Sequence, residues 1–124
     1  MTPENNSGIF VVIVNWQRSQ ETIECIRSIL NGDLSIARVL VVDNGSQDDS
    51  IAQITSAFPE TQVYSLPENL GFTGGYNYGI QMALDAGANQ ICILNNDTVV
   101  DDHTINTLME SGCDVAVPKI YYQN

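Results

Sequence analysis

Basic residues are scarce in this sequence. Only four of its 124 residues are Lys or Arg, against 15 Asp and Glu, and the formal net charge is −11. A chain with this balance repels polyanions, which argues against DNA and RNA as partners. A phosphate-bearing ligand must then be bound by backbone amides, a helix N-terminus or a bound cation. The composition therefore predicts no nucleic-acid partner and favours a divalent metal wherever phosphate is bound.

Long apolar runs and paired cysteines are also missing. No run approaches the roughly 20 apolar residues that cross a bilayer, and the first six residues, MTPENN, lack the basic start of a secretory signal. The three cysteines, Cys25, Cys92 and Cys113, form no C-x-x-C pair, which indicates buried, reduced thiols. We expect a cytoplasmic domain without a transmembrane segment, with the full-length form either free or peripheral to the inner face of the membrane.

Short apolar runs alternate with segments of helical period along the chain. The sequence is 44% hydrophobic and long enough for one core, so residues 1–124 are expected to form a single domain. The apolar runs predict strands at residues 9–14, 39–42, 62–65, 90–94 and 115–117. The first two runs are rich in β-branched residues without polar alternation, which is typical of parallel strands covered on both faces.

Helices are predicted between these strands. The first has Ser19 as its cap and Gly32 as its stop. The second opens with a capping box at residues 46–49, and the third leads from a glycine-rich segment at 69–75 to about Gly87. The sequence therefore predicts an α/β fold with a mostly parallel, Rossmann-like sheet flanked by helices.

An acidic residue follows the second predicted strand. Asp43 opens the run DNGS, at the edge of the sheet where open α/β proteins bind ligands. Its carboxylate only accepts hydrogen bonds, so it suits the imide N–H of uracil or thymine. Residues 43–46 are equally compatible with an ordinary turn followed by a helix cap. Both interpretations stay open from the residues alone.

The segment from Asn69 to Asn77 holds closely set glycines before a predicted helix. Glycines at positions 71, 74 and 75 let a backbone approach a ligand, and a helix N-terminus presents free N–H groups to negative charge. The fingerprint G-x-G-x-x-G is missing and the segment follows the third strand, which argues against NAD. The segment is therefore a candidate phosphate-binding element, with a purely structural turn as the alternative.

Two amides and a carboxylate, Asn95, Asn96 and Asp97, follow the fourth predicted strand. Mg²⁺ and Mn²⁺ prefer oxygen ligands, and Mg²⁺ usually takes only one or two carboxylates beside phosphate and water. Asp97 is therefore the candidate metal ligand. Asp101 and Asp102 are expected instead to charge the start of a further helix.

Four blocks occur in an order that closely resembles family 2 glycosyltransferases of the GT-A type, particularly the rhamnosyltransferase-like members. They are VIVNW at 12–16, VVDNGS at 41–46, NLGFTGG at 69–75 and LNNDT at 94–98, and VPKIYY at 117–122 is similar to the block that follows. The resemblance spans residues 9 to about 122. It implies a GT-A fold and binding of a nucleoside-diphosphate sugar, with UDP- and dTDP-sugars both open.

The resemblance also implies roles for individual residues. Asp43 corresponds to the residue that recognises the base, and Val14 and Asn15 to the strand end that lines the nucleoside pocket. Asp97 corresponds to the last acidic residue of the D-x-D motif, which holds Mg²⁺ or Mn²⁺. Asn95 stands where that motif has its first acidic residue, so it is expected to contact the ribose or a metal-bound water. The candidate donor-binding set is Val14, Asn15, Asp43, Asn69, Gly71, Gly74, Gly75, Asn95 and Asn96, with Asp97 for the metal.

The implied reaction is an inverting transfer of the sugar to an acceptor hydroxyl. In the family a carboxylate base deprotonates the acceptor, and that base is expected beyond Asn124, so the chain is expected to be a truncated donor part that is inactive alone. The acceptor of the full-length enzyme is expected to be a saccharide or a lipid-linked molecule.

Three alternatives remain open at this point. One is a module that binds nucleotide sugars without catalysis. Another is a receiver-type signalling domain, which needs an acidic pair after the first strand, where Asn15 and Trp16 stand. An unpaired sheet edge also leaves self-association open.

Overall fold

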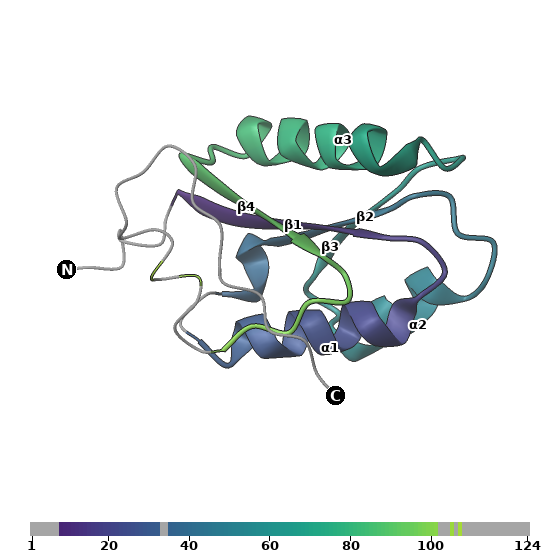
Figure 1. The fold of residues 1–124 in the computed structure, drawn as a ribbon, viewed down its shortest axis with the longest axis horizontal. Coiled ribbons are helices and arrows are strands. Elements are labelled where there is room, and N and C mark those ends of the chain that lie inside the picture. Colours follow the sequence, from purple (N-terminus) through teal and green to yellow (C-terminus); the bar gives the residue numbers. More distant parts are fainter. Residues whose placement is uncertain (1–7, 33–34, 102–104, 106, 108–124) are drawn as a thin grey trace.

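The computed structural model describes residues 8–32, 35–101, 105 and 107. In this part of the chain, four parallel strands form one sheet in the order β3-β2-β1-β4. Helices α1 and α2 lie on one face of the sheet and α3 lies on the other (Figure 1). The predicted α/β fold with a parallel sheet flanked by helices is confirmed. The strands are β1 (Ile9–Asn15), β2 (Val39–Asp43), β3 (Gln62–Ser65) and β4 (Gln90–Asn95), and the helices are α1 (Ser19–Leu30), η2 (Ile36–Arg38), α2 (Ser50–Ala57) and α3 (Gly71–Asp85).

The two central strands are buried on both faces, as their unbroken apolar runs predict. Alternate residues of β1 enter two separate apolar clusters, with Val11 and Ile13 on the α1 side and Phe10 and Val12 on the α3 side. The α1 side receives the apolar stripe of α1, including Ile26. This packing fixes which face of the sheet each residue at the strand ends occupies.

The predicted cap of α1 is wrong. Ser19 is the first helical residue, and Arg18 occupies the cap position without a capping side-chain hydrogen bond. The Ser19 hydroxyl instead donates a hydrogen bond to Oε1 of Gln53 on α2. The Ser19 hydroxyl, which the local sequence predicts to cap α1, therefore binds a side chain of another helix. The predicted end of the helix before Gly32 is confirmed.

The predicted capping box of α2 is also wrong. The helix begins at Ser50, four residues later than Ser46, and Asp49 occupies the cap position. Oδ1 of Asp48 accepts a hydrogen bond from the Ser50 N–H at 3.0 Å. Because Asp43 binds both the hydroxyl and the N–H of Ser46, that residue is held at the end of β2.

Helix α3 lies close to the sheet because two of its glycines face the strands. A Cβ at position 79 would lie 2.4 Å from Cγ1 of Val12, and one at position 75 would lie 3.1 Å from Cγ1 of Val14. The helix starts at Gly71, so Gly74 and Gly75 belong to its first turns and not to a preceding loop, which corrects the predicted boundary. The helix ends at Asp85, and Gly87 adopts a positive φ of 97° just beyond it, as predicted.

The cysteines that the structure describes are unpaired thiols. Cys25 on α1 is buried and Cys92 on β4 is half-buried. Burial raises the pKa of Cys25 to about 12 and the pKa of Cys92 to about 11. Both thiols are therefore protonated at neutral pH.

Some predictions fall on other parts of the chain. Cys113, Asp102 and the strand predicted at 115–117 lie outside the described residues. Within the described part, no helix is long and apolar enough to span a bilayer.

Candidate functional site

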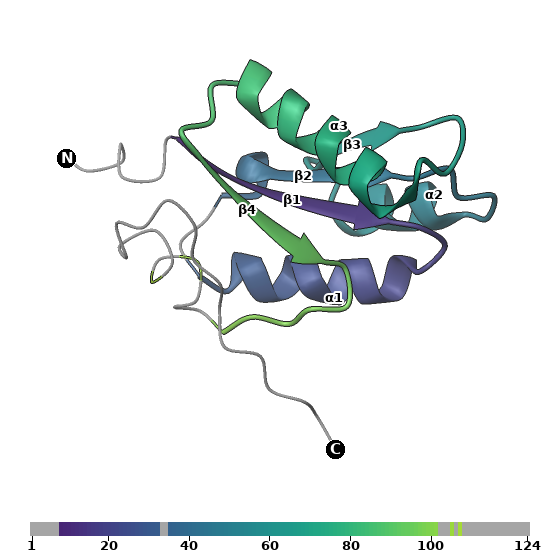
Figure 2. The same cartoon turned by 45° about the horizontal axis from the view of Figure 1, so that its top comes forward.

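The carboxyl ends of three strands meet at one edge of the sheet. Asn15 at the end of β1 pairs in register with Asp43 at the end of β2, and Val14 pairs with Asn95 at the end of β4. These strands end on the same side of the molecule as the start of α3 (Figure 2). Parallel pairing thus brings together residues from four widely separated parts of the sequence.

Asp43 is the centre of the buried polar contacts at this edge. Its side chain is fully buried. Oδ1 accepts hydrogen bonds from Nδ2 of Asn15 at 2.9 Å and from the Ser46 hydroxyl at 2.7 Å, and Oδ2 accepts one from the Ser46 N–H at 3.0 Å. Three donors therefore surround a carboxylate that solvent does not reach. The contact of Asp43 with a base stays a prediction.

Asn15 connects Asp43 to helix α1. Its Oδ1 accepts a hydrogen bond from the hydroxyl of Thr22 at 2.6 Å, and both side chains are fully buried. The oxygen of the same hydroxyl accepts a hydrogen bond from Nδ2 of Asn96 at 3.2 Å. The sequence analysis missed Thr22. Its signal was a polar residue in line with Ile26 and Ile29 on the apolar face of α1.

The opposite face of the sheet holds the start of α3. Nδ2 of Asn44 donates to the carbonyl of Gly71 at 3.0 Å, and its Oδ1 accepts from the Leu70 N–H at 2.9 Å. The Gly71 N–H donates to Oδ1 of Asn69 at 2.7 Å. Asn44 thus fixes the N-terminus of a 15-residue helix beside β2, a role that the sequence analysis did not assign.

The N-terminus of α3 can attract an anion. The first turn of a helix carries N–H groups without intrahelical partners and the positive end of the helix dipole. The first turn of α3 contains no acidic residue, so no side-chain charge of the turn opposes an anion there. Asn69 and Gly71 are exposed at this end, Gly74 is half-buried and Gly75 is buried against the sheet.

The residues after β4 form the third part of the edge. Asn95 and Asp97 are exposed, and Asn96 is half-buried. Among the described residues no three His, Cys, Asp or Glu side chains gather into a cluster that could hold a cation. A single exposed carboxylate is a suitable ligand for Mg²⁺ or Mn²⁺ when phosphate and water complete the coordination. Asp97 fits that kind of site.

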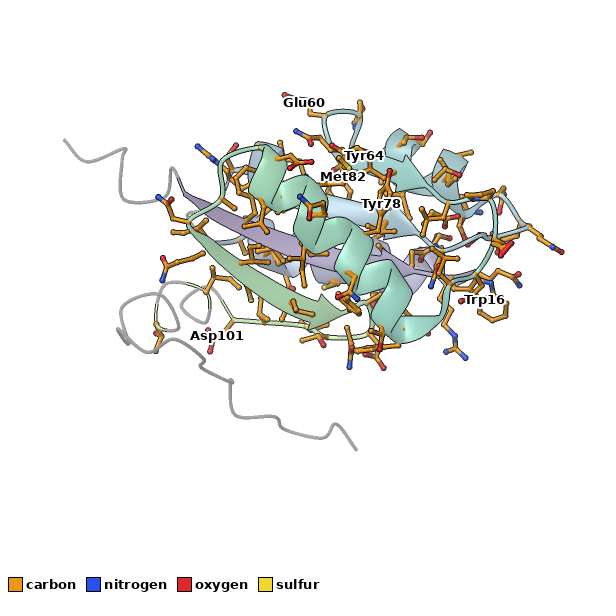
Figure 3. The ribbon with its side chains drawn as sticks, turned by 90° about the horizontal axis from the view of Figure 1, so that it is seen from above. Trp16, Glu60, Tyr64, Tyr78, Met82 and Asp101 are labelled. Atoms are coloured by element: carbon orange, nitrogen blue, oxygen red, sulfur yellow. The ribbon has the colours of Figure 1, made fainter. Side chains whose placement is uncertain are left out.

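Two exposed aromatic side chains lie near this edge. Trp16 directly follows β1 and is 47% exposed, and Phe72 in the first turn of α3 is 67% exposed. The Gln17 N–H, next to Trp16, donates to the Ser46 hydroxyl oxygen at 2.8 Å, which ties this turn to the end of β2. Figure 3 shows Trp16 at one end of the molecule and Asp101 far from it. The sequence analysis gave Trp16 no ligand role, although a large aromatic residue at a strand end is a recognisable signal.

The structure thus brings most of the predicted site residues to one edge and divides them between two faces. Val14 and Gly75 lie on the α3 side, and Asn15 and Asp43 lie on the α1 side. The remaining predicted residues follow β3, or end or follow β4, at the same edge: Asn69, Gly71, Gly74, Asn95, Asn96 and Asp97.

The sequence profile of Glycosyl transferase family 2 matches residues 10–124. The chain belongs to this family. A receiver-type signalling domain is thereby excluded. No curated protein matches the sequence.

Two solved structures illustrate the similarity of fold. S. aureus TarS, in the crystal structure of residues 1–349, has a TM-score of 0.60 and 19% identity, covering 80% of this chain and 30% of that one. The mannosyltransferase PcManGT from Pyrobaculum calidifontis, in complex with GDP-Man and Mn²⁺, has a TM-score of 0.65 and 16% identity, covering 86% and 33%. The fold is therefore GT-A-like, and this chain spans about a third of the length of these solved chains.

Proposed function

We propose that this chain binds a nucleoside-diphosphate sugar through a divalent metal and supplies the donor side of an inverting glycosyl transfer. The observation that carries the proposal is the single sheet edge where the Asn15–Asp43 pair, the N-terminus of α3 and Asp97 meet. These three parts suit a nucleoside, a diphosphate and a cation that coordinates the diphosphate. Family membership supports the same class of donor.

The nucleoside end lies beside β1 and β2. The exposed indole of Trp16 offers a flat surface on which a base can stack. Asp43 has one carboxylate lone pair left beyond its three hydrogen bonds, on Oδ2. Because Asp43 is fully buried, an imide N–H reaches that position only if the residues around it move. The resemblance of the sequence makes UDP and dTDP the first candidate nucleotides. GDP is a third candidate, because the structure of PcManGT contains GDP-Man.

The diphosphate end needs a cation because the chain has a net charge of −11. Asp97 would hold Mg²⁺ or Mn²⁺, and the N-terminus of α3 would face a phosphate oxygen. A bound metal would stabilise the charge of the departing diphosphate. The complex of PcManGT with GDP-Man and Mn²⁺ is consistent with this cofactor.

Transfer also needs a base near the acceptor hydroxyl. The carboxylate of Asp43 is enclosed, Asp97 is assigned to the metal, and Asp101 lies far from Trp16 (Figure 3). We propose, as the resemblance of the sequence implies, that the base and the saccharide or lipid-linked acceptor site lie beyond Asn124. The rhamnosyltransferase-like branch remains part of the proposal because of the block order alone.

Titration calorimetry tests the donor proposal. UDP, dTDP and GDP are titrated into the chain with Mn²⁺, with Mg²⁺ and with EDTA. We expect at least one nucleotide to bind with a metal and to bind about tenfold or more weakly with EDTA. Asp97→Ala should remove most of that difference. The matched control is Asp85→Ala, which removes an exposed carboxylate at the far end of α3.

Two results would reject the proposal. If none of the three nucleotides binds with either metal, the chain is not a donor site of this kind. If a nucleotide binds equally well with metal and with EDTA, or Asp97→Ala keeps the full metal dependence, Asp97 is not the metal ligand.

A further inference from the structure

A continuous line of hydrogen bonds crosses the buried side of the candidate site. It runs from Asp43 to Asn15, from Asn15 to Thr22 and from Thr22 to Asn96, with distances of 2.9, 2.6 and 3.2 Å. We call these four residues the polar link. It joins the ends of β2 and β1 to the turn after β4 through one residue of α1.

The chemistry of its members gives the polar link a fixed direction. A carboxylate only accepts, so Asn15 must turn its Nδ2 group toward Asp43 and its Oδ1 toward Thr22. Thr22 has a single hydroxyl proton, which it donates to Asn15. Thr22 can then only accept from Asn96, so Asn96 must present Nδ2 to Thr22. The charge of Asp43 therefore sets which way the amide of Asn96 faces.

We propose that Thr22 is a positioning residue that couples the nucleoside end of the site to the metal end. The inference rests on the proposed function, because it needs a nucleotide beside Asp43 and a cation at Asp97. Asn96 immediately precedes Asp97, so the orientation of Asn96 constrains the backbone that carries the metal ligand. A ligand that shifts Asn15 thereby changes the turn that holds the cation.

The position of Thr22 suits this role better than a purely structural one. A threonine hydroxyl in a helix ordinarily bonds to a carbonyl of the preceding turn, as Thr55 does with Ile51 at 2.8 Å on α2. The hydroxyl of Thr22 bonds to side chains from two strand ends instead, and it is fully buried. It is the one α1 contribution to the polar link, and it contacts Asn15 and Asn96 rather than Asp43 or Asp97.

The test is a metal-coupling measurement. For each variant the affinity for UDP is measured with Mn²⁺ and with EDTA, and the ratio of the two affinities gives the coupling. If dTDP or GDP binds the parent chain more tightly, that nucleotide replaces UDP. Thr22→Val keeps the β-branched shape and removes both hydrogen bonds, so we expect the ratio to fall by about tenfold. Thr22→Ser keeps the hydroxyl and should retain the parent ratio.

Thr55→Val is the matched control, because it makes the same substitution on α2 away from the polar link. Its ratio should equal that of the parent. The inference is overturned if Thr22→Val keeps the parent ratio, or if Thr22→Ser loses as much as Thr22→Val. Absence of nucleotide binding by the parent chain would instead reject the proposed function, so the two failures are distinguishable.

A measurement on the parent chain does not depend on the folding of any variant. In a ¹⁵N spectrum of the side-chain amides, the chain is first saturated with UDP and Mg²⁺ is then added. We expect the Nδ2 signals of both Asn96 and Asn15 to shift, because the polar link carries the change at the metal end to Asn15. A shift of Asn96 with Asn15 unchanged would show that the two ends are independent.

Discussion

Replacement of Asp43 tests whether the buried carboxylate organises the site. In Asp43→Ala, three donors lose their acceptor: Nδ2 of Asn15, and the hydroxyl and N–H of Ser46. A buried donor left without a partner costs about 1–3 kcal/mol. Asn15 is fully buried and keeps only a long contact of Nδ2 with the Ser46 hydroxyl oxygen at 3.5 Å, whereas Ser46 is half-buried and regains some hydrogen bonding to water. We expect Asp43→Ala to lower the free energy of unfolding by about 3–5 kcal/mol.

The isosteric variant Asp43→Asn separates the individual bonds. Its amide oxygen can still accept from Asn15 and from the Ser46 hydroxyl, but its NH₂ group would face the Ser46 N–H. Two hydrogen-bond donors then face each other, and we expect the free energy of unfolding to fall by about 1–3 kcal/mol. A typical domain has only about 5–15 kcal/mol of stability, so the two variants should differ measurably from each other and from the parent.

Urea unfolding measures these losses. Far-UV circular dichroism follows the whole chain, and the fluorescence of Trp16, its only tryptophan, follows the edge next to Asn15. Asp85→Asn is the control, since Asp85 is exposed and accepts a hydrogen bond from Gln81 on the same helix. It should stay within about 0.5 kcal/mol of the parent. The reasoning is refuted if Asp43→Ala costs less than about 1 kcal/mol, or if Asp43→Asn costs as much as Asp43→Ala.

The same variants distinguish two ways in which Asp43 can act on a nucleotide. Asp43→Ala should weaken UDP or dTDP binding by about 1.5–3 kcal/mol. If Asp43 acts by holding Asn15 and Ser46, Asp43→Asn retains most of the affinity. If Asp43 accepts a hydrogen bond directly from the imide N–H of the base, both variants lose the preference for a pyrimidine base.

Three further predictions follow from the packing, the buried acids and the assigned roles. Gly79→Ala should destabilise the chain by about 1–3 kcal/mol in urea unfolding, because its Cβ would lie 2.4 Å from Val12; an unchanged stability would contradict the close packing of α3. Burial raises the pKa values of Cys25, Cys92 and Tyr76 to about 12, 11 and 12, so the unfolded chain loses these protons at a lower pH than the folded chain. The contribution of these three groups to the free energy of unfolding should therefore be fully present below about pH 9 and fall as the pH rises toward about 12. The double variant Cys25→Ala, Cys92→Ala should show a smaller decrease in urea midpoint over this pH range. The chain should bind its donor nucleotide yet release no nucleoside diphosphate from nucleotide sugars above the buffer rate when acceptors are added; acceptor-dependent release would place a base within the chain.

The sequence alone determined the four described strands, their parallel arrangement and the edge at which the candidate site residues lie. The runs in β1 and β2 lack polar alternation, so they suit only strands buried on both faces, and that burial is what the structure shows. The position of Asp43 at the end of β2 followed from the same pattern, since the polar residue ends the apolar run. The four ordered blocks also identified the family, which the match over residues 10–124 confirms.

Only the tertiary structure decided which polar side chains pair at that edge. Ser19 and Ser46 have local cap propensity, but the Ser19 hydroxyl binds Gln53 on another helix and the Ser46 hydroxyl binds Asp43 at the end of β2. Cap propensities are of the same size as a single hydrogen bond, so such contacts can override them. The sequence predicted that Gly75 lies in a loop, whereas in the structure it lies in α3 and allows the helix to approach Val14. Thr22 differed in sequence from the exposed polar residues of α1 only by its place on the apolar face, and that place did not predict its partners. Its contacts with Asn15 and Asn96 form because α1 packs against the sheet face on which these two strand ends present their side chains. Local sequence patterns do not encode which side chains meet in this way.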